Sequence, residues 1–432
     1  MMSENLFAYT ATDAGYSTGT AGAIHGDRTA ASATAFTAVK NKIGSGLNGD
    51  PAFFNFFEGN SSRLVLRQYT YSTTDLRANQ IIAPQGNWQA PLATPTWSAV
   101  ANLHGVANYS SSWLYATGYD LSKIAVVNMG TDYSQDFEYS FPTSFTNFTN
   151  PYADGVFHGE AMVVVGTSLY ALFYVNKGSG YGTYYDSIVA KFNIDTDLGE
   201  LTFDSYVTAG KNSFTLDLYN NKLYVCSLGG MQNAGSGNAE TKLSIIDLGK
   251  FTQAGVTHVT IDSPTTNGDF RDISIVNDNH VYLFLGHYDA SYGNLVGGVY
   301  HTTLANLTTP STWTKIIDVN SMGYLWGIHA DGYRLWFVKG TPIDVFDGTP
   351  TTTVTASKAF SITDMSDFDG GNLNSACFIA PDVAGAGKLK AAGVSAPTAS
   401  KSLASHIRLA REACELAEKC KKQRVCAFDI EC

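Results

Sequence analysis

The feature that most constrains the fold is a short apolar motif that recurs seven times along the chain. Each copy joins a Leu or Val to an aromatic or apolar neighbour, as in Trp113–Ala116, Ser168–Ala171 and Lys222–Val225. The anchoring residues stand at positions 6, 64, 114, 169, 223, 281 and 335, at intervals of 50 to 58 residues. A fixed period of this order is typical of propeller and solenoid proteins.

Each repeat contains the pattern of four short strands. The clearest copy places strands at 160–165, 169–175, 188–194 and 201–207, and Gly199 lies in the turn before the last of them. Strands of five to eight residues separated by Gly, Asn and Asp turns predict an all-β propeller. A series of sandwich domains is the alternative, but each needs about 100 residues and fits the period less well.

The two ends of the repeat array predict how the ring closes. The first repeat begins at Asn5 without an inner strand, and the segment 371–379 reads as that missing strand near the other end. Pairing of these two segments would remove the free sheet edges of a linear array. We therefore expect a seven-bladed β-propeller over residues 1–380, with its first blade built from both ends.

Two details of the repeats resemble a known group of proteins. Leu223–Val225 has the Leu-Tyr-Val strand, and Ile194–Gly199 has the Ile-Asp-x-x-x-Gly turn. This pattern resembles the bacterial YVTN and quinoprotein-like repeat proteins over roughly residues 5–380. The resemblance implies a β-propeller and carries no specific activity.

The composition changes after the predicted ring. Residues 381–402 are rich in Ala, Gly, Ser, Lys, Thr and Pro and predict a linker, whereas 403–432 predict an α-helical tail. Apolar residues at 403, 407, 410, 414 and 417 form a stripe on that helix. The stripe could pack on the ring or on a second copy of the chain, giving a homo-oligomer. Four cysteines stand six residues apart at 414, 420, 426 and 432, a poor spacing for zinc.

Charge and hydropathy exclude some partners and favour a location. The net charge is −11, which divides into −14 for the ring and +3 for the segment 381–432. An acidic ring lacks the basic face that binding to nucleic acid requires, and no apolar run is long enough for a transmembrane segment. The start of the sequence at Met1 shows no leader, which leaves either a cytosolic protein or a processed exported one. The composition, with a low charged fraction of 15%, favours an extracellular, cell-surface or periplasmic protein.

Polar residues near the starts of the predicted inner strands form the candidate ligand site. A few convergent polar groups in a concave setting are typical of ligand sites, although such groups also satisfy backbone and water around a channel. No third histidine accompanies the two in this set, so we expect no metal there and no cofactor. The candidates are His104, His158, Glu160, Asp269, Arg271 and Tyr324.

One loop offers a separate prediction for calcium. Asp364, Asp367 and Asp369 lie close together in sequence and could hold Ca²⁺ through their oxygen atoms. No Glu closes the loop as the twelve-residue calcium loop requires. A solvated connection between blades is the alternative interpretation.

The motifs favour a binding function over catalysis. The chain has no Gly-x-Ser-x-Gly elbow, no phosphate-binding Gly loop and no His-Glu-x-x-His helix. We therefore expect an exported propeller that binds a protein or glycan at the cell surface, or that serves as a structural or assembly part of the cell envelope. The alternative is a hydrolase- or lyase-like enzyme that uses His104, His158 and Arg271 at the channel mouth.

Overall fold

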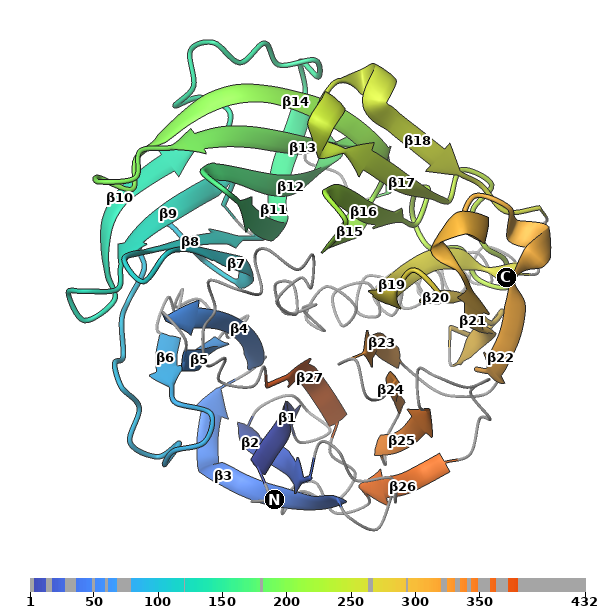
Figure 1. Ribbon diagram of the computed structural model, residues 1–432, viewed down its shortest axis with the longest axis horizontal. Helices are drawn as coiled ribbons and strands as arrows, with labels where there is room; N and C mark the ends of the chain where they lie inside the picture. Colours follow the sequence, from blue (N-terminus) through green and yellow to red (C-terminus); the bar gives the residue numbers. More distant parts are fainter. Residues whose placement is uncertain are drawn as a thin grey trace, which may run out of the picture.

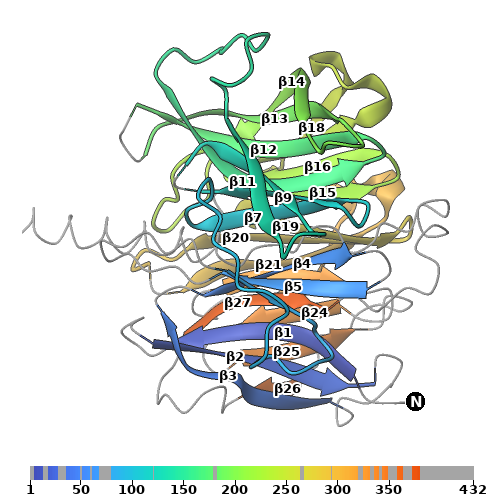
Figure 2. The ribbon, with the colours of Figure 1, turned by 90° about the vertical axis from the view of Figure 1, so that its left-hand side faces the viewer.

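The chain forms a ring of small β-sheets around a central axis (Figure 1). Seen from the side, most strands run roughly along that axis (Figure 2). The computed structural model describes residues 4–12, 18–27, 36–48, 51–58, 61–67, 79–119, 121–178, 182–262, 267–292, 294–319, 325–330, 335–339, 343–348, 358–362 and 372–379.

Within those residues, five four-stranded sheets are each built from four consecutive strands, which form antiparallel neighbours. Their innermost strands are β7, β11, β15, β19 and β23 (Figure 1). The first of these sheets contains β7 (Leu103–Tyr109), β8 (Trp113–Gly118), β9 (Lys123–Asn128) and β10 (Ser134–Ser140). The second contains β11 (Gly155–Val165), β12 (Ser168–Lys177), β13 (Tyr184–Ile194) and β14 (Leu201–Lys211). The third contains β15 (Ser213–Tyr219), β16 (Lys222–Ser227), β17 (Lys242–Asp247) and β18 (Val256–Val259). The other two are β19 (Asp269–Asn277), β20 (His280–Tyr288), β21 (Leu295–Thr302), β22 (Thr314–Asp318); and β23 (Leu325–Ala330), β24 (Leu335–Lys339), β25 (Ile343–Gly348), β26 (Lys358–Ile362).

The ring is closed by strands from both ends of the chain, as the sequence predicts. The sixth four-stranded sheet has the order β27-β1-β2-β3, in which the late strand β27 is innermost. Antiparallel pairing joins Ala8 to Cys377 and Tyr9 to Ala376. These strands are β1 (Glu4–Thr12), β2 (Thr18–Gly26), β3 (Phe36–Asn48) and β27 (Asn372–Phe378).

The prediction of seven four-stranded blades holds for six of them only. A three-stranded sheet lies between the β27-β1-β2-β3 sheet and the β7–β10 sheet, and its inner strand contacts both β27 and β7. Because a full blade needs a fourth strand, the described residues give six complete blades and a three-stranded sheet. Its strands are β4 (Ala52–Glu58), β5 (Ser61–Arg67) and β6 (Asn79–Ile82).

Each core cluster lies between two neighbouring sheets, so the middle strands are buried on both faces. On β16, Leu223 and Val225 pack toward the β11–β14 sheet, whereas Tyr224 and Cys226 pack toward the β19–β22 sheet. Since successive side chains of a strand point to opposite faces, both sets must be apolar. This two-sided burial explains why the repeated motif is continuously apolar instead of alternating with polar residues.

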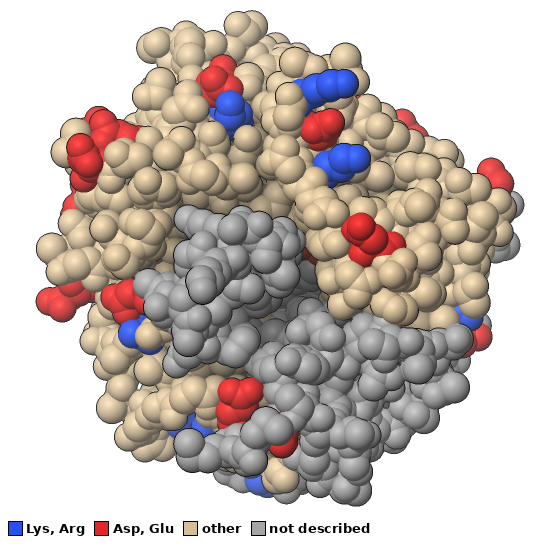
Figure 3. All heavy atoms as spheres, viewed as in Figure 1, with Lys and Arg blue, Asp and Glu red and all other residues tan. Residues whose placement is uncertain are grey.

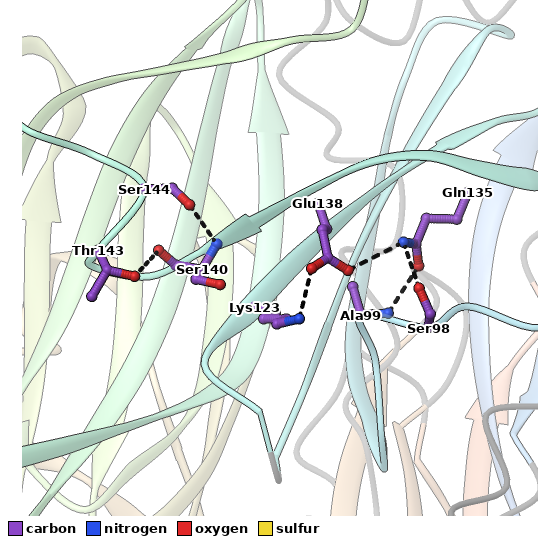
Figure 4. Close-up of polar contacts among 8 residues, drawn as sticks. All are labelled: Ser98, Ala99, Lys123, Gln135, Glu138, Ser140, Thr143 and Ser144. Atoms are coloured by element: carbon purple, nitrogen blue, oxygen red, sulfur yellow. Dashed lines mark hydrogen bonds and ion pairs between the residues drawn. The ribbon is translucent and has the colours of Figure 1, made fainter.

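The outer edge of the β7–β10 sheet is fixed by polar contacts (Figure 4). Lys123 Nζ lies 2.7 Å from Glu138 Oε1, across β9 and β10. Gln135 of β10 accepts a 3.0 Å hydrogen bond from the Ala99 backbone and donates one of 3.0 Å to Ser98 Oγ. These bonds connect the outermost strand to the segment that leads into the innermost strand β7.

The helices whose bounds lie within the described residues are single 3₁₀ turns. No helix among them has the length and apolar character needed to cross a membrane. The predicted linker 381–402 and the helical, cysteine-containing tail 403–432 lie outside the described residues, so the tail and any oligomer built on it stay predictions. The turns are η2 (Leu248–Lys250), η3 (Gln253–Gly255), η4 (Leu304–Asn306) and η5 (Pro310–Thr312).

Charged side chains are sparse on the face of the ring that Figure 3 shows. On the described part of that face, acidic and basic groups occur singly or side by side, and most of the surface is uncharged. This distribution fits a chain in which only 15% of residues are charged.

Candidate functional site

Buried polar side chains gather where the inner strands β7, β11, β15 and β19 begin. Because each of these strands is the first of its sheet and the sheets repeat around the axis, their starts lie at one end of the ring, which we call the entrance face. His104, Glu160, Ser213, Asp269 and Arg271 are each at most 2% exposed. Buried polar groups are costly unless they are paired, so their partners define what this face can do.

The closest charged pair at the entrance face joins two neighbouring sheets. His104 Nδ1 of β7 lies 3.0 Å from Glu160 Oε2 of β11, and both side chains are almost fully buried. With the histidine neutral, the carboxylate fixes Nδ1 as the protonated nitrogen and leaves Nε2 as an acceptor. The sequence identified both residues as candidates but did not predict that they pair.

Two glycines allow the strands that carry this pair to approach. A Cβ on Gly159 would lie 1.9 Å from Thr117 Oγ1, and a Cβ on Gly105 would lie 3.0 Å from the Ala161 Cα. The pairing of β11 with β12 also shifts register between Gly159 and Ala161, a β-bulge that redirects the side chain between them. Gly105 and Gly159, each of which directly follows a histidine in the sequence, are therefore required by the packing at this site.

His158 occupies an aromatic stack beside the pair. Its ring stacks against both Tyr119 and Tyr174, with centroid separations of 4.7 and 4.6 Å, and the two tyrosine rings lie 5.7 Å from each other. Nδ1 donates to the Tyr119 carbonyl oxygen at 2.8 Å, which leaves Nε2 to accept from Asn176 Nδ2 at 3.4 Å. The His104 ring lies 5.3 Å from Tyr119, so this tyrosine contacts both histidines.

Arg67 is a buried cation that the sequence analysis missed. It ends β5, is 2% exposed, and its Nη1 donates to the Leu103 carbonyl oxygen at 3.0 Å and to Asn102 Oδ1. The guanidinium therefore holds the backbone immediately before His104. The sequence feature that could have identified Arg67 is its position directly after the apolar run Leu64–Leu66. An ionised side chain beside a buried strand needs partners, which indicates a buried polar contact there.

A second group of polar side chains lies at the start of β19. Asn238 donates to both carboxylate oxygens of Asp269, from its backbone at 2.5 Å and from its side chain at 3.2 Å. Burial nevertheless raises the pKa of Asp269 to about 7, against the opposing effects of Arg271 and Asn238. Asp269 is thus poised to gain or lose a proton near neutral pH.

Arg271 is held in a fixed orientation next to that carboxyl group. Its Nε donates to the Gly286 carbonyl oxygen at 2.6 Å, its Nη2 donates to Gln232 Oε1, and its guanidinium lies 5.1 Å from the Tyr288 ring centroid. Gln232 and Asn238 come from the segment after β16 and were not predicted. Only the tertiary structure brings that segment to β19.

Other sequence candidates have structural roles or lie outside the described residues. Asp272, close to Arg271 in sequence, accepts from the backbones of Ile273 and Ile328 at 2.9 and 2.8 Å and so connects β19 to β23. Tyr324 and the proposed calcium loop with Asp364, Asp367 and Asp369 fall outside the described ranges. Among the residues that the structure describes, no three His, Cys, Asp or Glu side chains gather to hold a metal ion.

Comparison by sequence finds no known protein family and no curated protein that matches the chain. Comparison of structures finds many propellers. A candidate 6-phosphogluconolactonase from Bacteroides uniformis has a TM-score of 0.56 and 14% identity, covering 87% of this chain and 100% of that one. The periplasmic gluconolactonase of Pseudomonas aeruginosa has a TM-score of 0.55 and 10% identity, covering 86% and 99%.

A further candidate 6-phosphogluconolactonase, from Bacteroides fragilis, has a TM-score of 0.56 and 12% identity, covering 87% of this chain and 98% of that chain. These comparisons correct the expectation of a non-catalytic binding or structural protein, because the solved neighbours bear the names of enzymes. At sequence identities of 10–14%, the structural similarity establishes the fold alone. The narrower resemblance to YVTN repeats stays a prediction. The chain has the β-propeller fold that these lactonase-named proteins share.

Proposed function

We propose that the chain is a hydrolase of sugar lactones, with its reacting groups at the entrance face of the ring. The observation that carries the proposal is the buried contact of 3.0 Å between His104 Nδ1 and Glu160 Oε2. The structural neighbours named as lactonases support the substrate class. This is the enzymatic alternative raised by the sequence, with the substrate now specified.

The His104–Glu160 pair has the chemistry that ester hydrolysis needs. A lactone is a cyclic ester, and its hydrolysis requires removal of a proton from the attacking water. Glu160 orients the imidazole and stabilises the cation that forms when Nε2 takes this proton. His104 is thus the general base, and Glu160 positions it without contacting substrate.

The fixed cations of the same face supply the electrostatic part of the reaction. Negative charge develops on the carbonyl oxygen as water adds, and preorganised donors stabilise it best where water is excluded. Arg271 is buried and held by Gly286 and Gln232, so its orientation needs no reorganisation during the reaction. We propose that Arg271 binds either the oxyanion that forms on the carbonyl oxygen or an anionic group of the substrate.

A second interpretation treats the His104–Glu160 pair as a structural connection between β7 and β11. The location of its members on neighbouring sheets favours this interpretation, because buried polar pairs hold adjoining elements in register. It predicts that substitution of either residue changes the stability of the protein, and that the wild-type protein has no lactonase activity at this site. One set of variants therefore separates the two interpretations.

The test measures acid release from glucono-δ-lactone and its 6-phosphate, after subtraction of spontaneous hydrolysis. General acid–base groups contribute about 10²–10⁴-fold, so we expect His104→Gln and Glu160→Gln to lower kcat/KM by about 100-fold or more. His258→Gln, at an exposed histidine of β18, is the matched control and should retain the rate. If the wild-type protein does not exceed the spontaneous rate, the hydrolase proposal fails; if His104→Gln retains full activity, this site is wrong.

We also propose that the protein works outside the cytoplasm. The low charged fraction supports this, and the periplasmic location in the name of the Pseudomonas aeruginosa neighbour is compatible with it. Fractionation of the source cells followed by immunoblotting tests the location. Recovery of the protein only with cytosolic markers would contradict the proposal.

A further inference from the structure

Two histidines meet on the β19–β22 sheet, away from the entrance face. His280 Nδ1 of β20 lies 3.1 Å from His301 Nε2 of β21, with the rings tilted by 38°. Asn277, at the far end of β19 from Asp269, pairs with His280. Since a strand rises about 3.3 Å per residue, the eight residue steps of β19 from Asp269 to Asn277 place the histidine pair roughly 26 Å from that carboxyl group.

Both imidazoles are partly accessible. Neither side chain is fully buried, so an ion can reach them from solvent. A neutral imidazole has one nitrogen lone pair free, which is the form that binds metals.

The nitrogens that would bind a metal are already adjacent. His280 Nδ1 and His301 Nε2 face each other, and one of these two nitrogens carries the proton of the hydrogen bond between them.

We propose that His280 and His301 form a two-histidine site for a divalent late transition metal: Cu²⁺, Ni²⁺ or Zn²⁺. Ligands at about 2.0–2.1 Å from a metal, at right or tetrahedral angles, lie roughly 2.8–3.4 Å apart, a range that contains the observed nitrogen separation of 3.1 Å. The histidine that carries the shared proton presents its facing nitrogen by moving that proton to its other ring nitrogen, with no change in charge. Imidazole nitrogens select these metals over Mg²⁺ and Ca²⁺, which prefer oxygen.

The site has two protein ligands, and water completes the coordination. Within the described ranges no third His, Cys, Asp or Glu joins the pair, so binding is reversible and weaker than at closed structural sites. The bound metal connects β20 to β21 at the far end of the sheet. This site is independent of the proposed lactone hydrolysis, and its loss leaves that activity unchanged.

The test titrates ZnCl₂ and NiCl₂ into the full-length chain by calorimetry, after alkylation of the cysteines with iodoacetamide to remove competing thiolates. Wild-type protein should bind one metal ion at this site. Loss of an outer-shell partner alone typically costs 10–100-fold, so removal of a ligand in His280→Ala or His301→Ala should weaken binding by about tenfold or more. The control His258→Ala removes an exposed histidine from a neighbouring sheet and should keep wild-type affinity.

Electron paramagnetic resonance with Cu²⁺ identifies the ligands directly. The wild-type spectrum should show coupling to two nitrogens, and each variant should show one. His280→Asn serves as a second variant. Its urea midpoint, measured without metal and compared with that of the wild type, shows whether the variant is correctly folded. The proposal is overturned if the wild-type protein binds none of the three metals, or if the folded His280 and His301 variants bind them as tightly as wild type.

Discussion

Substitution of Gly159 by alanine tests the packing that brings Glu160 to His104. The added Cβ would lie 1.9 Å from Thr117 Oγ1 and 2.9 Å from the Thr117 Cβ and Cγ2. Thr117 is fully buried, and its hydroxyl donates to the Lys123 carbonyl oxygen at 2.8 Å. The threonine therefore cannot turn away without giving up that hydrogen bond.

The expected cost follows from these two effects. Overpacking of a core costs about 1–3 kcal/mol. Loss of a buried hydrogen bond adds about 1–3 kcal/mol when its acceptor is left unpaired. We therefore expect Gly159→Ala to lower the free energy of unfolding by about 2–5 kcal/mol. Thr117→Gly removes the obstructing atoms, so the double variant should be more stable than the sum of the single effects implies, by about 1 kcal/mol or more.

The assay is urea denaturation of the full chain, followed by circular dichroism, with stability differences taken from the midpoints and slopes. Gly86→Ala is the matched control, because its Cβ would meet only ordinary contacts at 3.4 Å. We expect that control to change stability by less than about 0.5 kcal/mol. Additivity of Gly159→Ala and Thr117→Gly within about 0.5 kcal/mol would refute the steric argument.

Two further predictions concern buried titratable groups. Burial raises the pKa of Asp269 to about 7 from an ordinary 3.8, so the folded chain keeps a proton that the unfolded chain has lost. Wild-type stability relative to Asp269→Asn should therefore fall as pH rises from about 4 to about 7, by at most about 1.4 kcal/mol per unit, and a pH-independent difference in urea midpoints would contradict this. Cys226 and Cys377 are buried, and burial raises the pKa of the Cys377 thiol, so neither should react with iodoacetamide until the protein is unfolded. Mass mapping that finds Cys377 alkylated in the folded protein would show that β27 does not close the ring as described.

Much of the architecture was predictable because it depends on local repetition. Segments such as Leu223–Cys226 are continuously apolar since both faces of the strand are covered, and the motif therefore recurs wherever a middle strand occurs. Closure by β27 was predictable because an incomplete first repeat needs a strand from elsewhere. The fourth strand beside β4–β6 was expected from the same periodicity, and the described residues do not contain it.

The candidate site was predictable in its residues and not in its contacts. His104, His158 and Arg271 lie ten or eleven residues before the anchors of their repeats, which sequence comparison within the chain can find, and Glu160 and Asp269 lie close to them in sequence. Their partners have no such regularity: Arg67 ends a second strand, and Gln232 and Asn238 lie in an irregular connection. Which side chains pair across two sheets depends on how closely the sheets approach each other, as at Gly159 and Thr117. The repeat period does not determine that distance.

The amino-acid sequence by itself determined a closed, all-β repeat ring, because strand length, turn residues and two-sided apolar strands act locally and recur at one period. The tertiary structure alone decided which polar groups meet. It joins His104 to Glu160 across two sheets, places Tyr119 in contact with both His104 and His158, and brings His280 to His301 on neighbouring strands. The physical reason is that burial rewards apolar surface wherever it lies, whereas a hydrogen bond or metal ligand requires two particular atoms at a particular distance.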